Sequence, residues 1–318
     1  MNPQASKKLR REQRQPFNEV CGILLLCSVF MLAAVLLTVL VQAGFTLLIS
    51  GIRNGGMDMD NILRTITTSL QENGVGYLLY AVACLVVILV WKGKAFYKTA
   101  FHSYRPMGFS VFFQLLCVFF SLQMAGSLIS GYLEGILNLW GLSTYSFLEE
   151  VTGGSKTVSM FLYVSVFAPI VEELLFRGAI LRTFQPYGKR FAIVFSALLF
   201  GLFHMNLVQT PFAFFLGLIL GYVAVEYSLT WSIVFHFINN CIMAELLSDY
   251  TNLQSVLMFL FVIAALIILT IHGNDLKAYH RSLNPMPKEA IRSFWTAPVT
   301  ILFLLVCLAS GLCCITVL

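Results

Sequence analysis

The chain has 318 residues, of which 58% are hydrophobic and only 11% are charged, and its mean hydropathy is +0.84. A soluble domain carries roughly a quarter charged residues, so this composition excludes an ordinary water-soluble protein and indicates one that lies in a membrane. The net charge of +5 does not indicate nucleic-acid binding, because the basic residues are confined to short segments between apolar runs. We therefore expect no nucleic-acid partner.

Nine apolar runs are candidate transmembrane helices, since about 20 residues cross a hydrocarbon core of about 30 Å. These runs are 20–49, 75–92, 109–132, 157–184, 190–206, 211–227, 231–248, 254–272 and 294–317. The sequence thus predicts an all-α polytopic membrane protein with about nine transmembrane helices, or eight as the alternative, and with its active site within the helix bundle. The first run is longer than a signal-peptide core and is expected to remain as a membrane helix.

The basic residues predict how these helices are oriented. All but three of the 20 lysines and arginines fall in the N-terminal tail or in the segments that end or follow the second, fourth and eighth runs. The exceptions are Arg53, Arg64 and Lys156. Because basic segments stay on the cytoplasmic side of a membrane, we expect a cytoplasmic N-terminus and an external C-terminus in the cell membrane.

The runs divide the chain into four parts. These are a basic cytoplasmic tail (1–19), N-terminal transmembrane helices (20–156), a core with unusual polar residues (157–248) and C-terminal transmembrane helices (249–318). The polar stretch 51–74 is expected to be external and to carry a short amphipathic helix.

Three ionisable residues interrupt the fourth apolar run at Glu172, Glu173 and Arg177. Each costs about 2.5–3.5 kcal/mol inside a membrane helix, and such groups usually face a cavity or one another. Glu173 and Arg177 are spaced i and i+4 and can pair along one helix face, whereas Glu172 points about 100° away. One acid can therefore be held by the arginine while the other stays available for chemistry, although the spacing does not decide which.

A histidine lies near the end of the fifth run, where His204 follows Phe200 by one turn. Glu172 lies 14 residues before Pro186, at the turn of a predicted helical hairpin. His204 lies 14 residues after Arg190, on the second arm. Equal distances from the turn give a similar depth, so Glu172 and His204 can meet if their helix faces agree.

The seventh run contains a second histidine, His236, which is followed one turn later by Asn240 on the same helix face. His236 comes early in this run, so a meeting with His204 requires a tilted or short sixth run. Pro169 and Pro211 favour irregular helices in this region.

A carboxylate, two imidazoles and an amide could together hydrolyse an amide bond. A buried glutamate can take a proton from water, and histidine and asparagine side chains can donate hydrogen bonds to the developing oxyanion. Alternatively, Glu172, His204 and His236 could hold zinc and leave one position open for water. Each set alone could also be a structural contact between helices, but their occurrence on neighbouring helices favours a catalytic site.

At these positions the chain resembles the CAAX-protease and bacteriocin-processing family of intramembrane proteases, which is related to the type II CAAX prenyl endopeptidase. The family's signatures E-E-x-x-x-R, F-x-x-x-H and H-x-x-x-N are all intact, over about residues 160–245. The resemblance implies an all-helical membrane endopeptidase with 157–248 as its protease core. The residues implied as catalytic are Glu172, Glu173, Arg177, His204, His236 and Asn240.

The resemblance also implies roles for these residues. Glu172 would be the water-activating base with His204 as its partner, Glu173 and Arg177 would support the site, and His236 and Asn240 would stabilise the oxyanion or position water. Family members are described both as metalloproteases and as metal-free glutamate proteases. The compact ligand motif H-E-x-x-H is absent, which favours the metal-free mechanism and leaves zinc as the alternative cofactor.

The expected partners are membrane lipid and a substrate that is a membrane-associated peptide or protein. One alternative is a non-proteolytic scaffold or bacteriocin-immunity protein of the same fold. A transporter is a further alternative, because buried acids can carry protons or ions. Transporters commonly contain paired halves with interrupted helices, and the polar interruptions here occur only in runs four to seven.

Overall fold

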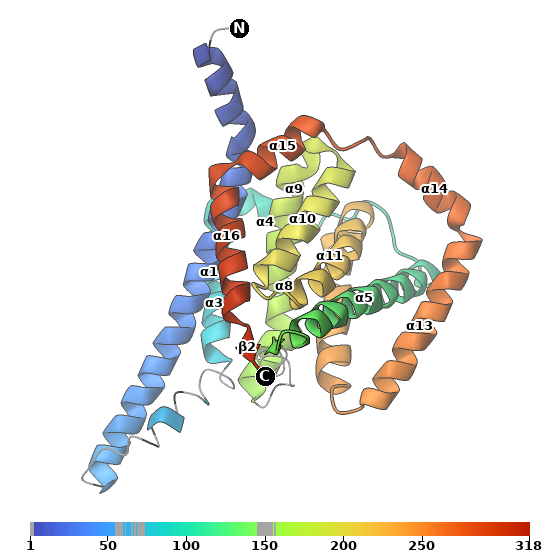
Figure 1. The fold of residues 1–318 in the computed structure, drawn as a ribbon. Coiled ribbons are helices and arrows are strands. Elements are labelled where there is room, and N and C mark those ends of the chain that lie inside the picture. Colours follow the sequence, from blue (N-terminus) through green and yellow to red (C-terminus); the bar gives the residue numbers. More distant parts are fainter. Residues whose placement is uncertain are drawn as a thin grey trace.

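The computed structural model describes residues 3–54, 74–144 and 157–318, together with residues 60, 62–64, 66, 68 and 155. These residues are almost entirely helical (Figure 1). Two short strands, β1 (Leu142–Ser143) and β2 (Thr316–Val317), pair antiparallel and tie the C-terminal end to the segment after the third long helix. The predicted all-α fold class is confirmed.

The helices are joined by short connections. The first group is α1 (Pro3–Asn54), α3 (Val75–Lys92), α4 (Lys94–Ala100) and α5 (Phe109–Asn138). The fourth apolar run forms one long helix with changing geometry, made of α7 (Val158–Leu162), η1 (Tyr163–Phe167), α8 (Ala168–Glu173), η2 (Leu174–Ile180), α9 (Leu181–Phe184) and η3 (Gln185–Tyr187). The remaining helices are α10 (Lys189–Phe203), α11 (Gln209–Glu226), α12 (Leu229–Phe237), η4 (Ile238–Leu246), α13 (Thr251–Ile271), α14 (Gly273–Ser282), α15 (Lys288–Thr296) and α16 (Pro298–Cys313).

Fewer helices than predicted have the length of a membrane span. Within the described ranges, six helices are long and apolar enough to cross a membrane, or seven if the bent pair α15 and α16 forms one span. The count of nine is therefore not reproduced. The predicted run 190–206 is α10, which has only 15 residues, and the run 231–248 is the nine-residue α12 continued by the π-helix η4. Apolar composition marks these segments as buried but does not fix their length.

Two further expectations concern the ends of α1. The basic tail 1–19 is not a separate unit, because α1 continues through it without a break. The predicted external stretch 51–74 begins inside α1, and most of that stretch lies outside the described residues.

An aromatic cluster joins α1 to the middle of the chain. Phe17 is fully buried, and its ring centroid lies 5.5 Å from Phe184, 6.0 Å from Phe191 and 5.7 Å from Phe294. Aromatic pairs at such distances add about 0.5–1.5 kcal/mol beyond their buried area. The N-terminal half of α1 is therefore part of the core, whereas its second half extends past the bundle (Figure 1).

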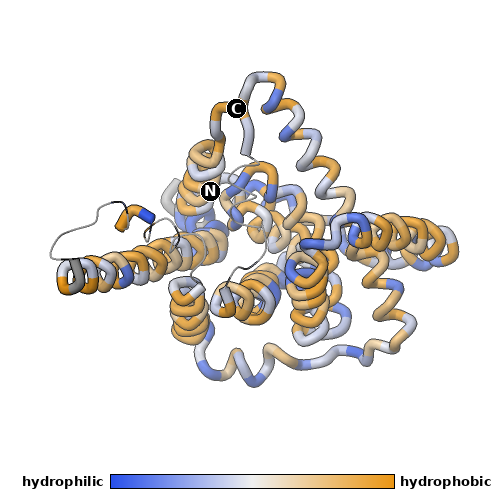
Figure 2. The backbone as a smooth tube through the Cα atoms, turned by 90° about the horizontal axis from the view of Figure 1, so that it is seen from below, coloured by the Kyte–Doolittle hydropathy of each residue, from blue (hydrophilic) through white to orange (hydrophobic). Residues whose placement is uncertain are grey.

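The segments predicted to be cytoplasmic gather at one end of the bundle. Arg14 donates a hydrogen bond to Thr296 Oγ1, and Lys92 Nζ donates to Thr183 Oγ1. Figure 1 shows the N-terminal end of α1 with α4, α9 and α15 at this end, and the C-terminus at the other. Figure 2 shows that most helical turns are apolar and that hydrophilic residues are frequent in the connecting segments.

Glycines allow the helices around the site to approach closely. A Cβ atom added at Gly201 would lie 2.7 Å from the Thr210 carbonyl oxygen, and one at Gly126 would lie 2.8 Å from Phe212 Cα. Small residues at helix contacts are typical of membrane bundles, where close van der Waals packing replaces the hydrophobic effect. These contacts fix the hairpin of α10 and α11 against α5.

We predict that Gly126→Ala destabilises the protein by about 1–3 kcal/mol, because the added methyl group meets the backbone of α11. Gly131→Ala, on the same helix, is the control, since no atom lies within 4 Å of its added Cβ and alanine favours a helix over glycine. Thermal unfolding in detergent measures both. Equal melting temperatures for the two variants would contradict this packing.

We also predict that the two termini lie on opposite sides of the membrane, with the N-terminus in the cytoplasm. A C-terminal alkaline phosphatase fusion should be active, because that enzyme folds only outside the cytoplasm, and a C-terminal fluorescent-protein fusion should be dark. The reverse pattern would mean that the positive-inside rule fails for this chain.

Candidate active site

The long helix that carries the two glutamates changes from α to π geometry on both sides of them. The π-helix η1 precedes α8, and η2 follows directly after Glu173. Pro169 lies at the start of α8 and has no N–H to donate to the carbonyl four residues earlier, which helps to explain the wider turn before it. Short π segments inside α-helices occur frequently at functional sites.

Glu173 is the centre of a buried hydrogen-bond network. Its Oε1 lies 2.7 Å from Arg177 Nη1 and 2.9 Å from His236 Nδ1. Its Oε2 accepts a hydrogen bond from Ser232 Oγ. The side chains of Glu173 and Arg177 are fully shielded from solvent. An ionised carboxylate only accepts hydrogen bonds, so His236 donates its Nδ1–H and leaves Nε2 for another partner.

Glu172 has a different environment. Its side chain is 22% exposed, and its Oε2 lies 3.7 Å from His236 Nε2. Among the residues that the structure describes, this is the ion-pair contact of Glu172. The two neighbouring acids thus meet opposite nitrogens of one imidazole, Glu173 at Nδ1 and Glu172 at Nε2.

His204 lies at the C-terminal end of α10, on the edge of the same cluster. Its Nδ1 lies 2.9 Å from the Phe200 carbonyl oxygen, so Nδ1–H is the donor and Nε2 carries the lone pair in the neutral ring. His204 is within electrostatic range of Glu172, but no ion pair joins these two described residues within 4.0 Å. The structure therefore pairs Glu172 with His236, whereas the family resemblance implied His204.

Phe200 joins the two imidazoles and the arginine. Its ring centroid is 5.0 Å from the ring of His204 and 5.8 Å from that of His236, in edge-to-face arrangements. The Arg177 guanidinium lies 4.2 Å from the same centroid. A cation over an aromatic face is attracted by the ring quadrupole, so Phe200 supports the buried arginine. The phenylalanine of the sequence motif is thus part of the site.

Asn240 is the least directly involved of the predicted site residues. Its Nδ2 donates to the Val164 carbonyl oxygen in η1, at 3.0 Å, and its Oδ1 accepts from Asn239. The change to π geometry at Ile238 also alters the i, i+4 relation to His236. Asn240 therefore links η4 to η1, and one of its amide hydrogens is already used for this.

The candidate metal ligands do not assemble into a ligand set. In the described part of the chain, no group of three or more histidine, cysteine, aspartate or glutamate side chains is arranged to hold an ion. Glu172, His204 and His236 offer the right donor atoms for zinc, but the Nε2 of His236 faces a carboxylate in this arrangement. The geometry does not fit a three-ligand zinc site, and the steps considered below use the side chains alone.

Sequence reasoning missed Ser232 and Asn239, both of which are buried. Ser232 precedes His236 by four residues, so the spacing S-x-x-x-H places both side chains on one face of α12. That spacing was available in the sequence, but a serine in an apolar run is too common to stand out. Asn239 had no comparable signal.

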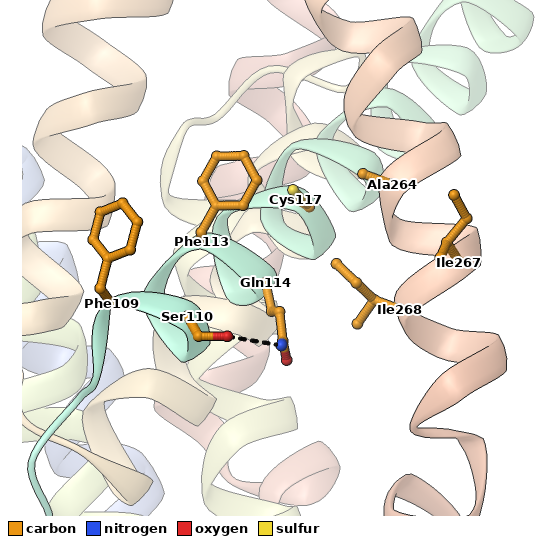
Figure 3. Close-up of a pocket in the computed structure, with 8 residues that line it drawn as sticks. All are labelled: Phe109, Ser110, Phe113, Gln114, Cys117, Ala264, Ile267 and Ile268. Atoms are coloured by element: carbon orange, nitrogen blue, oxygen red, sulfur yellow. Dashed lines mark hydrogen bonds between the residues drawn. The ribbon is translucent and has the colours of Figure 1, made fainter.

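An apolar groove lies elsewhere, between α5 and α13 (Figure 3). Its walls include Phe109, Phe113, Ile267 and Ile268, and Gln114 donates a hydrogen bond to Ser110 at its edge. None of the predicted site residues belongs to α5 or α13. The groove and the candidate site are therefore distinct features.

Comparison with known proteins points to one family. Residues 154–242 match the family model described as Rce1-like, type II CAAX prenyl endopeptidase Rce1-like. This segment is a little over a quarter of the chain and contains Glu172, Glu173, Arg177, Phe200, His204, His236 and Asn240. No curated protein and no solved structure matches the chain.

We predict that Arg177→Met destabilises the protein by about 3–5 kcal/mol, because it leaves the Glu173 carboxylate buried without a counter-charge. Lys189→Met is the matched control. It removes a 2.8 Å ion pair with Glu226 in which the lysine side chain is 51% exposed, and such a pair contributes about 0–1 kcal/mol. Thermal unfolding of the two purified variants should show the difference, and similar shifts for both would contradict the buried pair.

Proposed function

The chain belongs to the CAAX-protease family, and we propose that it is an intramembrane endopeptidase that hydrolyses a peptide bond near the membrane by glutamate-activated water. The observation that carries this proposal is the division between the two adjacent acids. Glu173 is fully buried and accepts from Arg177, His236 and Ser232. Glu172 is partly exposed and has a single, longer contact.

This division assigns different work to the two acids. A general base must reach water and must have an oxygen free to accept a proton. Glu172 meets both requirements, so it takes the proton from the attacking water. Glu173 has both oxygens occupied and no exposed surface, so it holds His236 in position.

The histidines act through Nε2. His236 lies between two carboxylates, and in its protonated form the Nε2–H can donate to the oxyanion that forms when water adds to the peptide carbonyl. His204 has its Nδ1–H on a backbone carbonyl, so its Nε2 can accept a proton and return it to the departing amine. The proton taken by Glu172 is likewise available to that amine, which completes the hydrolysis without a covalent intermediate.

The position of the site suggests the class of substrate. Glu173 lies near the middle of the 30-residue span Val158–Tyr187, so a scissile bond must reach below the membrane surface. A peptide or protein segment that is associated with the bilayer can do this. We propose such a segment as the substrate, with membrane lipid as the surrounding partner and the cell membrane as the location.

We predict that Glu172→Gln lowers kcat/KM for peptide hydrolysis by about 10²–10⁴-fold, as expected when a general base is removed, while the melting temperature stays near that of the wild type. Glu226→Gln is the control, because Glu226 lies at the end of α11 and contacts Lys189 and Tyr279 instead of the site. The assay uses purified protein and a fluorogenic peptide library, with and without a metal chelator.

Three outcomes of this assay would be informative. Equal cleavage by the wild type and Glu172→Gln would contradict the role of Glu172. Loss of wild-type activity with chelator, and its recovery with zinc, would contradict the metal-free mechanism. A wild-type protein that cleaves nothing, in cells where Glu172→Gln retains the full phenotype, would favour a non-proteolytic scaffold or immunity protein of the same fold.

A further inference from the structure

A serine outside the three sequence motifs completes the buried network. We propose that Ser232 is a positioning residue of the hydrolytic site, whose hydroxyl fixes the Glu173 carboxylate so that His236 keeps its Nε2 directed at Glu172. This inference rests on the proposed function and adds a residue to it. Ser232 does not touch the position where a substrate would react, so it acts through Glu173 and His236.

The two oxygens of Glu173 have different partners. Arg177 and His236 both bind Oε1, at 2.7 and 2.9 Å, whereas Ser232 Oγ lies 2.5 Å from Oε2. Donors on one oxygen alone leave the carboxylate free to swing its second oxygen. Ser232 supplies the contact on that second oxygen and thereby sets the plane of the carboxylate.

Water cannot take over this role. Glu173, Ser232 and Arg177 are each between 0% and 1% exposed. An acceptor that loses its donor in such a place stays unpaired, which is costly because no solvent replaces the hydrogen bond. The serine hydroxyl is therefore required for the ionised carboxylate to be fully satisfied.

The hydroxyl proton has two possible acceptors. Ser232 Oγ also lies 3.0 Å from the carbonyl oxygen of Leu220 in α11, and a serine has only one proton to donate. The carbonyl of Leu220 lies inside a helix, where it accepts from the helix ladder. The shorter contact, to a charged oxygen, is the stronger acceptor, so the proton is directed at Glu173.

Several charged or titratable groups surround Glu173. Arg177 comes from η2 and His236 from α12, while Glu172 is adjacent in α8 and His204 approaches from the end of α10. Of these, Arg177 and His236 favour the ionised form of Glu173. Removal of the serine hydroxyl takes away one of three donors to that form, so Glu173 then gains a proton at a higher pH and releases its hold on His236.

The first test is the pH dependence of peptide hydrolysis by Ser232→Ala. We expect kcat/KM to fall by about 10- to 100-fold, mostly through kcat, and the acidic limb of the profile to move to higher pH. Ser232→Cys is a second variant of similar size with a weaker donor, and it should be intermediate. Ser121→Ala is the matched control, because Ser121 donates to the Phe261 carbonyl in another helix contact. An unchanged pH profile in Ser232→Ala, with wild-type kcat/KM, would overturn the proposal.

The second test does not depend on activity. Magic-angle-spinning NMR of protein labelled with ¹⁵N-histidine in lipid reports which ring nitrogen of His236 carries a proton, and His236→Gln identifies its signal. We expect an Nδ1–H signal in the wild type and in Ser121→Ala, and a shifted or mixed signal in Ser232→Ala. The same His236 signal in all three proteins would overturn the positioning role.

The two tests separate the two claims. If the wild type cleaves no peptide while the NMR signal of His236 responds to Ser232→Ala, the proposed function fails and the positioning role of Ser232 stands. If the wild type cleaves and Ser232→Ala changes neither the pH profile nor the NMR signal, the inference about Ser232 fails and the proposed function stands.

Discussion

A carboxylate in the middle of a membrane bundle must be neutralised where it lies, and the rest of this site depends on how Glu173 meets that requirement. Its charge is balanced by Arg177, and its remaining lone pairs accept from His236 and Ser232. Replacing a buried pair of this kind with apolar residues can be neutral or stabilising, whereas removing one partner costs several kcal/mol. The network is therefore weak evidence for stability and stronger evidence that a fixed imidazole is needed here.

The fold serves this network by bringing four helical segments to one place. The hairpin of α10 and α11 packs closely because glycines lie at its contacts, and Phe200 places an aromatic face against Arg177 and both histidines. The π segments η1, η2 and η4 lie beside the residues that carry the site. Irregular helix geometry is thus concentrated where polar side chains must be aimed, and the surrounding helices remain regular.

Much of this could be predicted from the sequence, because the strongest signals were chemical. Charged residues inside apolar runs are rare enough that Glu172, Glu173, Arg177, His204 and His236 stood out, and the i, i+4 spacing correctly anticipated the pair of Glu173 with Arg177. The number of spans could not be predicted, since α10 and α12 are as apolar as longer helices. The partner of Glu172 was also missed, because a π turn shifts side chains around the helix axis and no spacing rule describes it. Ser232 was missed because one serine in an apolar run carries no distinctive pattern.

The central claim is that Glu172, and not Glu173, faces the reacting bond. The most direct measurement is a cryo-electron microscopy structure of the Glu172→Gln variant in lipid with an uncleaved peptide bound. The account predicts a scissile carbonyl within about 3–4 Å of residue 172 or of a water bound to it, with the Nε2 atoms of His204 and His236 facing the same bond. A peptide that contacts Glu173 instead, or one bound about 10 Å or more from both glutamates, would contradict it.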